Sequence, residues 1–198
     1  AGSYGQTNKL YLNNGKVARF TGWTGTDVGS EGDYTASLVV GDIDGDGDLD
    51  VVAGNNGQIN QLYLNNGTAT PFANVTPSNV GSEVNNTESL ALGDIDGDGD
   101  LDIVVGNILS FNQLYLNDGT AAKPFENVTP CTFGLGNGYT YGLALGDLDG
   151  DGDLDVVGGN DRATNNLYLN NGNNFCNAGL SVVGSEDDRT RSLALGDV

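Results

Sequence analysis

The 198-residue chain carries 27 acidic and seven basic side chains, a formal net charge of -20 that would repel a phosphate backbone, so we expect no nucleic acid partner. The chain has no His, and its two Cys fall outside any CxxC spacing, which excludes a zinc site or a Cys/His nucleophile within it. No stretch approaches the roughly 20 apolar residues of a spanning helix, so we expect no membrane span.

A repeat of about 52 residues organises the chain. The motif Leu-Tyr-Leu-Asn recurs around Tyr11, Tyr63, Tyr115 and Tyr168, at spacings of 52, 52 and 53 residues. Periods near 50 residues are typical of propellers and solenoid arrays. An extended β-solenoid is the structural alternative, although it usually has a shorter period.

Four short strands are predicted in each repeat. In the first full repeat they cover residues 37–43, 49–54, 60–64 and 72–76, the last being the Phe-Ala-Asn-Val-Thr segment. These runs are β-branched or aromatic and are bounded by Gly, Asn, Asp and Pro, and no segment shows a helical apolar period. The sequence therefore predicts an all-β fold, a β-propeller of four-stranded blades with Asp-rich calcium loops.

The boundaries of the predicted blades do not coincide with the ends of the sequence. A partial blade covers residues 1–35, three blades cover 36–87, 88–140 and 141–191, and residues 192–198 begin an incomplete blade. The two end pieces match complementary parts of one blade that lacks the equivalent of residues 44–52. Either the ends meet in a shared blade, or another chain or further sequence supplies the missing strand. The chain is thus a single propeller domain or a propeller fragment.

Each full repeat contains an acidic loop, GDIDGDGDLD or GDLDGDGDLD. With the first Asp as position 1, carboxylates stand at positions 1, 3, 5, 7 and 9, and Gly at position 6 permits a sharp turn. Alternating carboxylates can supply the oxygen ligands that Ca²⁺ requires, whereas without a cation they would repel one another. The candidate calcium ligands are Asp42, Asp44, Asp46, Asp48, Asp50, Asp94, Asp96, Asp98, Asp100, Asp102, Asp147, Asp149, Asp151, Asp153 and Asp155.

The second half of this loop differs from an EF-hand. Position 12 holds Ala53, Val105 or Gly158 in place of the bidentate Glu, and the closing carboxylate is at position 9. We expect side-chain ligands from positions 1, 3, 5 and 9, a backbone carbonyl at position 7, and the Asp at position 7 outside the coordination shell. The chain is predicted to bind three calcium ions, with a fourth, shared site where another loop begins at Asp197.

The loop, the following NxLYxNNG segment and the FxxVT segment resemble bacterial VCBS and FG-GAP-like repeats over nearly the whole chain. The resemblance implies a calcium-bearing β-propeller, distantly similar to the integrin α-subunit head and to propeller lectins. The Phe-Gly and Gly-Ala-Pro signatures of integrin repeats are absent, so integrin-like ligand binding is not implied. The third repeat also departs, with Phe175, Cys176 and Asn177 in place of the Phe-x-Asn-Val-Thr segment.

Three further groups of residues are candidates for modification or binding. Asn66, Asn74, Asn85 and Asn127 begin Asn-x-Ser/Thr sequons, which suit glycosylation, although Asn-rich turns also produce sequons by chance. Cys131 and Cys176 either form a disulfide or stay inert thiols. Trp23, Tyr34, Tyr139 and Tyr141 lie between blades, where they could stack on a sugar or simply cap blade packing.

These features predict a secreted or cell-surface protein that binds or adheres through a calcium-stabilised propeller, with a carbohydrate or a surface protein as the partner. The alternative is a structural protein whose self-association, as a dimer or filament, completes the unfinished blade. We expect no enzymatic activity, because nearly all paired carboxylates belong to the acidic loops.

Overall fold

The regular structure in this computed structural model is β-sheet apart from one 3-10 turn. The structure describes residues 2–12, 25–29, 32–119, 122–172, 175–185 and 189–196. The elements are β1 (Asn8–Leu10), β2 (Thr26–Val28), β3 (Thr35–Gly41), β4 (Asp50–Tyr63), β5 (Ser78–Gly93), β6 (Asp102–Ile108), β7 (Asn112–Tyr115), β8 (Cys131–Phe133), β9 (Thr140–Gly146), β10 (Asp155–Asn160), β11 (Asn165–Tyr168), η1 (Phe175–Asn177) and β12 (Leu180–Val183). The all-β prediction is confirmed, and the described residues contain no helix that could span a membrane.

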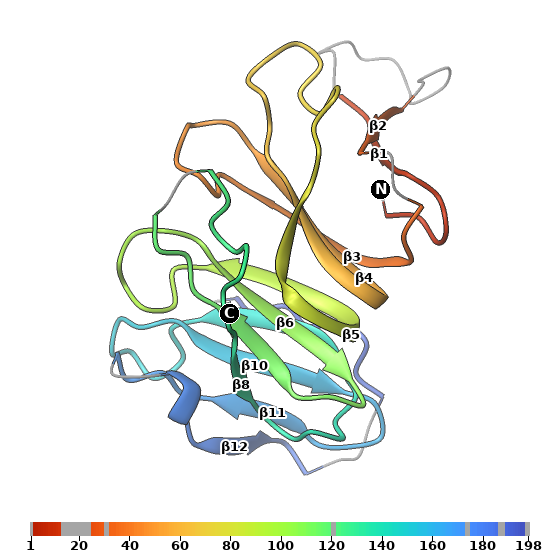
Figure 1. Ribbon diagram of the computed structural model, residues 1–198. Coiled ribbons are helices and arrows are strands. Elements are labelled where there is room, and N and C mark those ends of the chain that lie inside the picture. Colours follow the sequence, from red (N-terminus) through yellow and green to blue (C-terminus); the bar gives the residue numbers. More distant parts are fainter. Residues whose placement is uncertain are drawn as a thin grey trace.

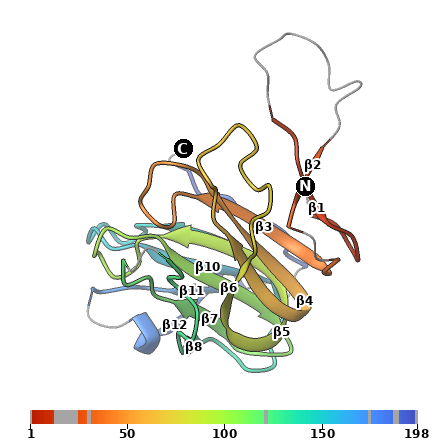
Figure 2. The ribbon, with the colours of Figure 1, turned by 45° about the horizontal axis from the view of Figure 1, so that its top comes forward.

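The strands form antiparallel blades that follow one another along the molecule (Figure 1). Blade 3 is the four-stranded sheet β9-β10-β11-β12. The six-stranded sheet holds two blades, because residues 50–55 of β4 pair with β3 while residues 56–62 pair with β5, whose residues 86–93 pair with β6. Blade 1 is therefore β3, β4 and the start of β5, and blade 2 is residues 86–93 of β5 with β6, β7 and β8. The β1–β2 hairpin lies at one end (Figure 2).

The fourth strand of each blade is not where the sequence suggested. Residues 72–76 were expected to be a strand, but residues 71–74 form a turn and the strand begins at Ser78. Asn74 and its counterpart Asn127 adopt left-handed backbone conformations, with φ of 61° and 67°, which break an extended chain. The preceding Phe72 and Phe125 are buried and hold the turn against the core. The Phe-x-Asn-Val-Thr segment is therefore a turn fixed by its Phe rather than a strand.

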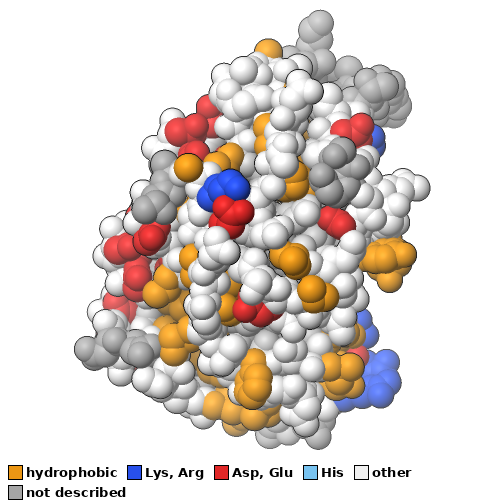
Figure 3. Space-filling view, viewed as in Figure 1, with side chains coloured by type: hydrophobic (Ala, Val, Ile, Leu, Met, Phe, Trp, Pro, Cys, Tyr) orange, Lys and Arg blue, Asp and Glu red, His pale blue; other side chains and the backbone are white. Residues whose placement is uncertain are grey.

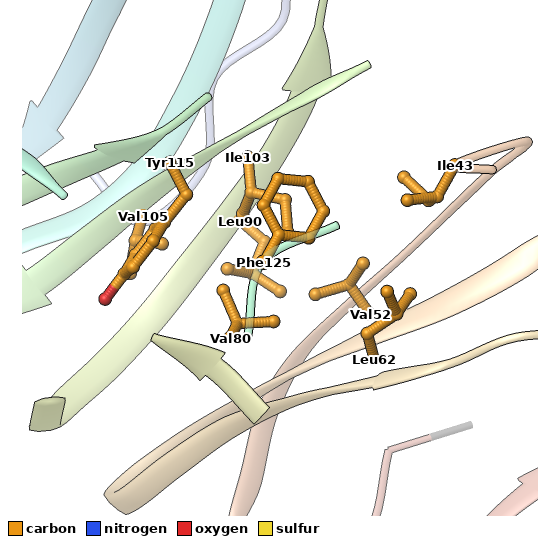
Figure 4. Packing of buried hydrophobic residues seen from close by; sticks show 9 residues of the cluster. All are labelled: Ile43, Val52, Leu62, Val80, Leu90, Ile103, Val105, Tyr115 and Phe125. Atoms are coloured by element: carbon orange, nitrogen blue, oxygen red, sulfur yellow. The ribbon is translucent and has the colours of Figure 1, made fainter. Parts of the chain in front are cut away.

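Both faces of blades 1 and 2 are buried against neighbouring strands, which explains the unbroken apolar runs after their acidic loops. Val52 packs with Leu90 and Ile103 of blade 2, whereas the adjacent Val51 faces Val28 of β2 on the opposite side. Blade 2 alternates in the same way, since the next core lies between it and blade 3. Figure 4 shows the core between blades 1 and 2, formed by Ile43, Val52, Leu62, Val80, Leu90, Ile103, Val105, Tyr115 and Phe125.

Leucine side chains of the following segment pack against the glycines at the ends of the first strands. A Cβ on Gly41 would lie 2.8 Å from Leu101 Cδ1, and a Cβ on Gly93 would lie 2.8 Å from Leu154 Cδ1. Gly146 repeats the arrangement, with Leu195 of the C-terminal segment 3.1 Å from its Cβ position. The Gly that opens each acidic loop therefore provides space for the neighbouring blade.

A buried chain of Asn and Thr side chains also joins the blades. Between blades 2 and 3, Asn112 Nδ2 donates to Thr140 Oγ1 at 3.1 Å, and this hydroxyl donates to Asn160 Oδ1 at 3.0 Å. The same contacts connect Asn8, Thr35 and Asn55 at the start of blade 1. Because buried polar groups require partners, these contacts fix how one blade is placed on the next.

Replacement of Gly93 by Ala should destabilise the protein by about 1–3 kcal/mol, because the added methyl group would overlap Leu154 and Leu145. The matched control is Gly179→Ala, since a Cβ at Gly179 would meet nothing within 4 Å. Urea unfolding at saturating calcium measures both. Equal stability of the two variants would contradict this view of the blade interface.

Candidate metal centre

Each acidic loop brings three carboxylates to one point at the same edge of its blade. The loops join β3 to β4, β5 to β6 and β9 to β10, and Figure 3 shows acidic side chains gathered along this edge. The ligand atoms of each group lie within 4.8 Å of one another. The groups consist of positions 1, 3 and 9 and are Asp42, Asp44 and Asp50; Asp94, Asp96 and Asp102; and Asp147, Asp149 and Asp155.

The Asp at position 9 is the buried member of each group. Asp50, Asp102 and Asp155 are 1%, 0% and 0% exposed. In blade 2 the two carboxylate oxygens of Asp102 accept hydrogen bonds from the backbone N–H groups of Ile95 at 2.8 Å and Asn117 at 2.9 Å. Burial raises the pKa of Asp102 to about 6, and burial also raises the pKa of Asp50. A cation beside these groups would favour their charged form.

The Asp at position 1 shapes the loop, and in loop 1 it also leaves an oxygen without a hydrogen-bond partner, whereas both oxygens accept backbone bonds in loops 2 and 3. Asp94 Oδ2 accepts from Gly99 N at 3.0 Å, and Asp42 Oδ2 accepts from Gly47 N at the same distance. Gly47, the predicted turn residue, has φ of 93°. Asp42 Oδ1 is buried without a hydrogen-bond partner, which is costly for a carboxylate. This orphaned oxygen, together with the all-oxygen donor set, fits a hard cation such as Ca²⁺.

Positions 5 and 7 lie outside the three-carboxylate groups. At position 5, Asp98 Oδ1 accepts from the backbone N–H of Asp100 at 3.0 Å, and Asp46 and Asp151 make the same contact in their loops. At position 7, Asp100 Oδ2 lies 2.7 Å from where a Cβ on Gly119 would be. This contact explains why Gly ends the Leu-Tyr-Leu-Asn-x-Gly motif, and coordination through positions 5 and 7 stays a prediction.

The Asn of the Leu-Tyr-Leu-Asn motif connects successive loops, a role that the sequence analysis missed. Asn117 N donates to Asp102 of its own blade, while Asn117 Nδ2 donates at 2.9 Å to the carbonyl of Ile43 in the loop of blade 1. Asn170 repeats the contact with Ile95 O at 2.7 Å. The recurrence of this Asn is visible in the sequence, but its partner in the preceding blade is not.

Among the described residues, no Asn from a following blade bonds to the acidic loop of blade 3 in this way. Position 2 is 2% exposed at Ile43 and 3% exposed at Ile95, because each side chain packs into the core of the following blade. Its counterpart Leu148 is 45% exposed. Asp147 and Asp149 are also more exposed than their counterparts in blade 1. The loop of blade 3 is therefore the least constrained of the three.

The remaining candidate residues lie apart from the metal groups. Cys131 of β8 and Cys176 of η1 form a disulfide that joins blades 2 and 3. Asn66, Asn74 and Asn127 are exposed, whereas Asn85 donates to Gln113 and the Thr87 of its sequon is buried. Tyr34 stacks on Tyr4, and Tyr139 and Tyr141 line a pocket. Trp23 and Asp197 lie outside the described residues.

Replacement of Asp96 by Asn should affect stability with opposite sign in the presence and absence of calcium. Burial and the neighbouring Asp98 carboxylate raise the pKa of Asp96, so removal of its charge relieves repulsion in the metal-free protein and raises its Tm. With calcium the same change removes a ligand and lowers Tm. Asp100→Asn, at position 7, is the matched control and should lower the calcium-bound Tm less. A fall in Tm under both conditions for Asp96→Asn would contradict a metal role.

Replacement of Asn117 by Ala should cost about 1–3 kcal/mol of unfolding free energy, because the carbonyl of Ile43 loses its buried donor. The matched control is Asn65→Ala. Among the described residues, the Asn65 side chain donates only to Leu49 O of its own loop, so its loss should cost less. Urea unfolding with calcium compares them, and a larger effect at Asn65 would refute the proposed bridge between loops.

Comparison with models of protein families identifies a repeat family. The model of the FG-GAP-like repeat matches four times, over residues 1–53, 42–105, 106–158 and 147–198, which together span the chain. A search of curated proteins finds no match. The four matched segments cover the antiparallel blades and include all three acidic loops. The chain is a member of the FG-GAP-like repeat family with a propeller-like all-β fold.

Proposed function

We propose that this chain is a calcium-stabilised β-propeller module for extracellular binding or adhesion. The observation that carries the proposal is the convergence of three Asp side chains in each loop, which in loop 1 includes the orphaned oxygen of Asp42. Repeats of this family are often extracellular, often bind calcium and are typically non-enzymatic. The proposed role of calcium is structural, because the loops hold adjacent blades together.

Several contacts support this role for calcium. Position 9 fixes the start of the second strand, and position 2 inserts into the core of the next blade. Asn117 and Asn170 each donate a side-chain hydrogen bond to a backbone carbonyl in the loop of the preceding blade. A cation that neutralises the carboxylates would therefore stabilise the inter-blade cores as well as the loop itself.

The disulfide supports an extracellular location. Cys131 and Cys176 are separated by 45 residues and are bonded across the interface of blades 2 and 3. Disulfides persist in oxidising compartments and are rare in the cytosol. Closing a loop of this length stabilises a protein by roughly 4 kcal/mol in the chain-entropy model. Three exposed sequons, at Asn66, Asn74 and Asn127, are compatible with the same location.

Self-association is the second candidate function. β12 is an edge strand that pairs only with β11 in the described part of the chain, and its side chains at Leu180, Val182 and Val183 are exposed. Exposed apolar edge strands favour pairing with another chain. Measurement of the molecular mass in solution, with and without calcium, tests this self-association. A monomer under both conditions would exclude a stable dimer or filament.

Removal of calcium with EGTA should lower Tm substantially. A ligand at 100 times its Kd stabilises by about 2.7 kcal/mol per site, so three independent sites would add about 8 kcal/mol, comparable to the stability of a whole domain. Calorimetry with EGTA, with calcium, and with calcium restored after EGTA measures the effect. An unchanged melting curve in excess EGTA would falsify the structural role of calcium.

A further inference from the structure

A pocket of about 600 Å³ lies between blades 2 and 3, within the size range of small-molecule sites. Its rim includes Asn137 and Tyr139 from the β8–β9 connection and Asp161, Arg162 and Thr164 from the β10–β11 turn. β9 begins at this pocket and ends at the acidic loop of blade 3. The pocket therefore opens at the opposite end of the blades from the metal groups.

Three of the seven basic residues of the chain lie around Asp161, and one of them, Arg162, lines the pocket. Arg191 Nη2 lies 3.0 Å from Asp161 Oδ2, and Arg189 Nε lies 3.4 Å from Asp161 Oδ1. Arg162 is adjacent, with Nε 4.0 Å from the same carboxylate. The side chains of Arg162, Arg189 and Arg191 are 74%, 62% and 58% exposed, and each of these ion pairs uses Asp161. Among the described residues, Arg189 and Arg191 are close enough to balance the Asp161 carboxylate, which leaves the Arg162 guanidinium group for an anion.

Comparison between repeats shows that the blade scaffold does not require this basic cluster. Arg162 has φ of 62°, and the equivalent turn positions are Gly5, Gly57 and Leu109, with φ of 69°, 71° and 58°. An Arg in this conformation is less favourable than the Gly of two other repeats, although Leu109 of blade 2 shows that the turn also accepts a side chain. The position of Arg191 is occupied by Glu88 in the contact between blades 1 and 2, where it accepts from Asn56.

The other groups on the rim suit a hydroxylated ligand. Tyr139 is 41% exposed and presents an aromatic ring, and Tyr141 is held in place by Arg191, whose guanidinium carbon lies 4.1 Å from its ring centroid. Asn137 and Thr164 add amide and hydroxyl groups. An aromatic ring covers the apolar face of a sugar, amides and hydroxyls bond its hydroxyl groups, and guanidinium groups pair with carboxylate or sulfate.

We propose that this pocket binds an acidic saccharide, with Arg162 as an anion-binding residue. The inference rests on the proposed function and specifies the ligand class of the binding module. Ligand charge provides the selectivity, because the acidic surface elsewhere repels anions, whereas Arg162 offers them a guanidinium group at the pocket.

Isothermal titration at saturating calcium, with three probes of similar length, tests the proposal. The probes are trigalacturonate, a sulfated galactan trisaccharide and neutral galactotriose. We expect both acidic probes, or one of them, to bind at least tenfold more tightly than the neutral probe, and the stronger one identifies carboxylate or sulfate as the anion. Equal binding of all three, or no binding of either acidic probe, overturns the proposal.

Arg162→Gly separates binding from folding. This variant should bind the acidic probe about tenfold more weakly while its Tm stays equal or rises, because Gly is the native residue at two of the three equivalent turn positions. Lys123→Gln is the charge-matched control, since Lys123 pairs with Glu126 outside the pocket, and it should leave affinity unchanged. Similar losses in both variants, or none in Arg162→Gly, overturn the proposal. If the unmodified protein binds neither acidic probe but keeps its calcium-dependent Tm shift, the pocket is rejected and the calcium role stands.

Discussion

The structure depends on the contact between one blade and the next. A blade with two apolar faces cannot bury both by itself, so the strands after the acidic loops are stable only between neighbours. Three repeated contacts fix this packing: leucines that fill the space above Gly41 and Gly93, the buried Asn and Thr chain, and the Asn that holds the preceding loop. The repeat period exists because the same contacts must form at every interface.

The acidic loops form part of this interface. Folding gathers three carboxylates within 4.8 Å and buries one of them, which is unfavourable without a cation. In the first two loops the sequence nevertheless places an Ile at position 2, directly between two of these carboxylates, and that residue enters the core of the next blade. Neutralising the loop and packing the blades are therefore coupled, in contrast to an exposed acidic turn that could change without affecting the core.

Local patterns in the sequence predicted the architecture better than they predicted its connections. The 52-residue period, the short strands and the alternate Asp residues correctly indicated an all-β, blade-like fold. The fourth strand was misplaced because the aromatic and β-branched residues at 72–76 form a turn around buried Phe72. The bridge from Asn117 to Ile43 spans 74 residues, and only the stacking of blades brings the two together. Position 5 was expected to join positions 1, 3 and 9; its carboxylate accepts a bond from the loop backbone, and its coordination of a cation stays a prediction.

Positions that break the repeat differ in meaning from positions that keep it. The repeated Gly, Asn, Thr and Leu residues are accounted for by contacts between blades, so their recurrence reflects packing. Arg162 instead occupies a left-handed turn position that two other repeats fill with Gly and blade 2 fills with Leu109, and no repeated packing contact explains an Arg there. Backbone strain that the scaffold does not require is most simply explained by a use for the side chain. In a protein built from near-identical blades, such departures are where a binding specificity can arise, because every identical position is already constrained by the neighbouring blade.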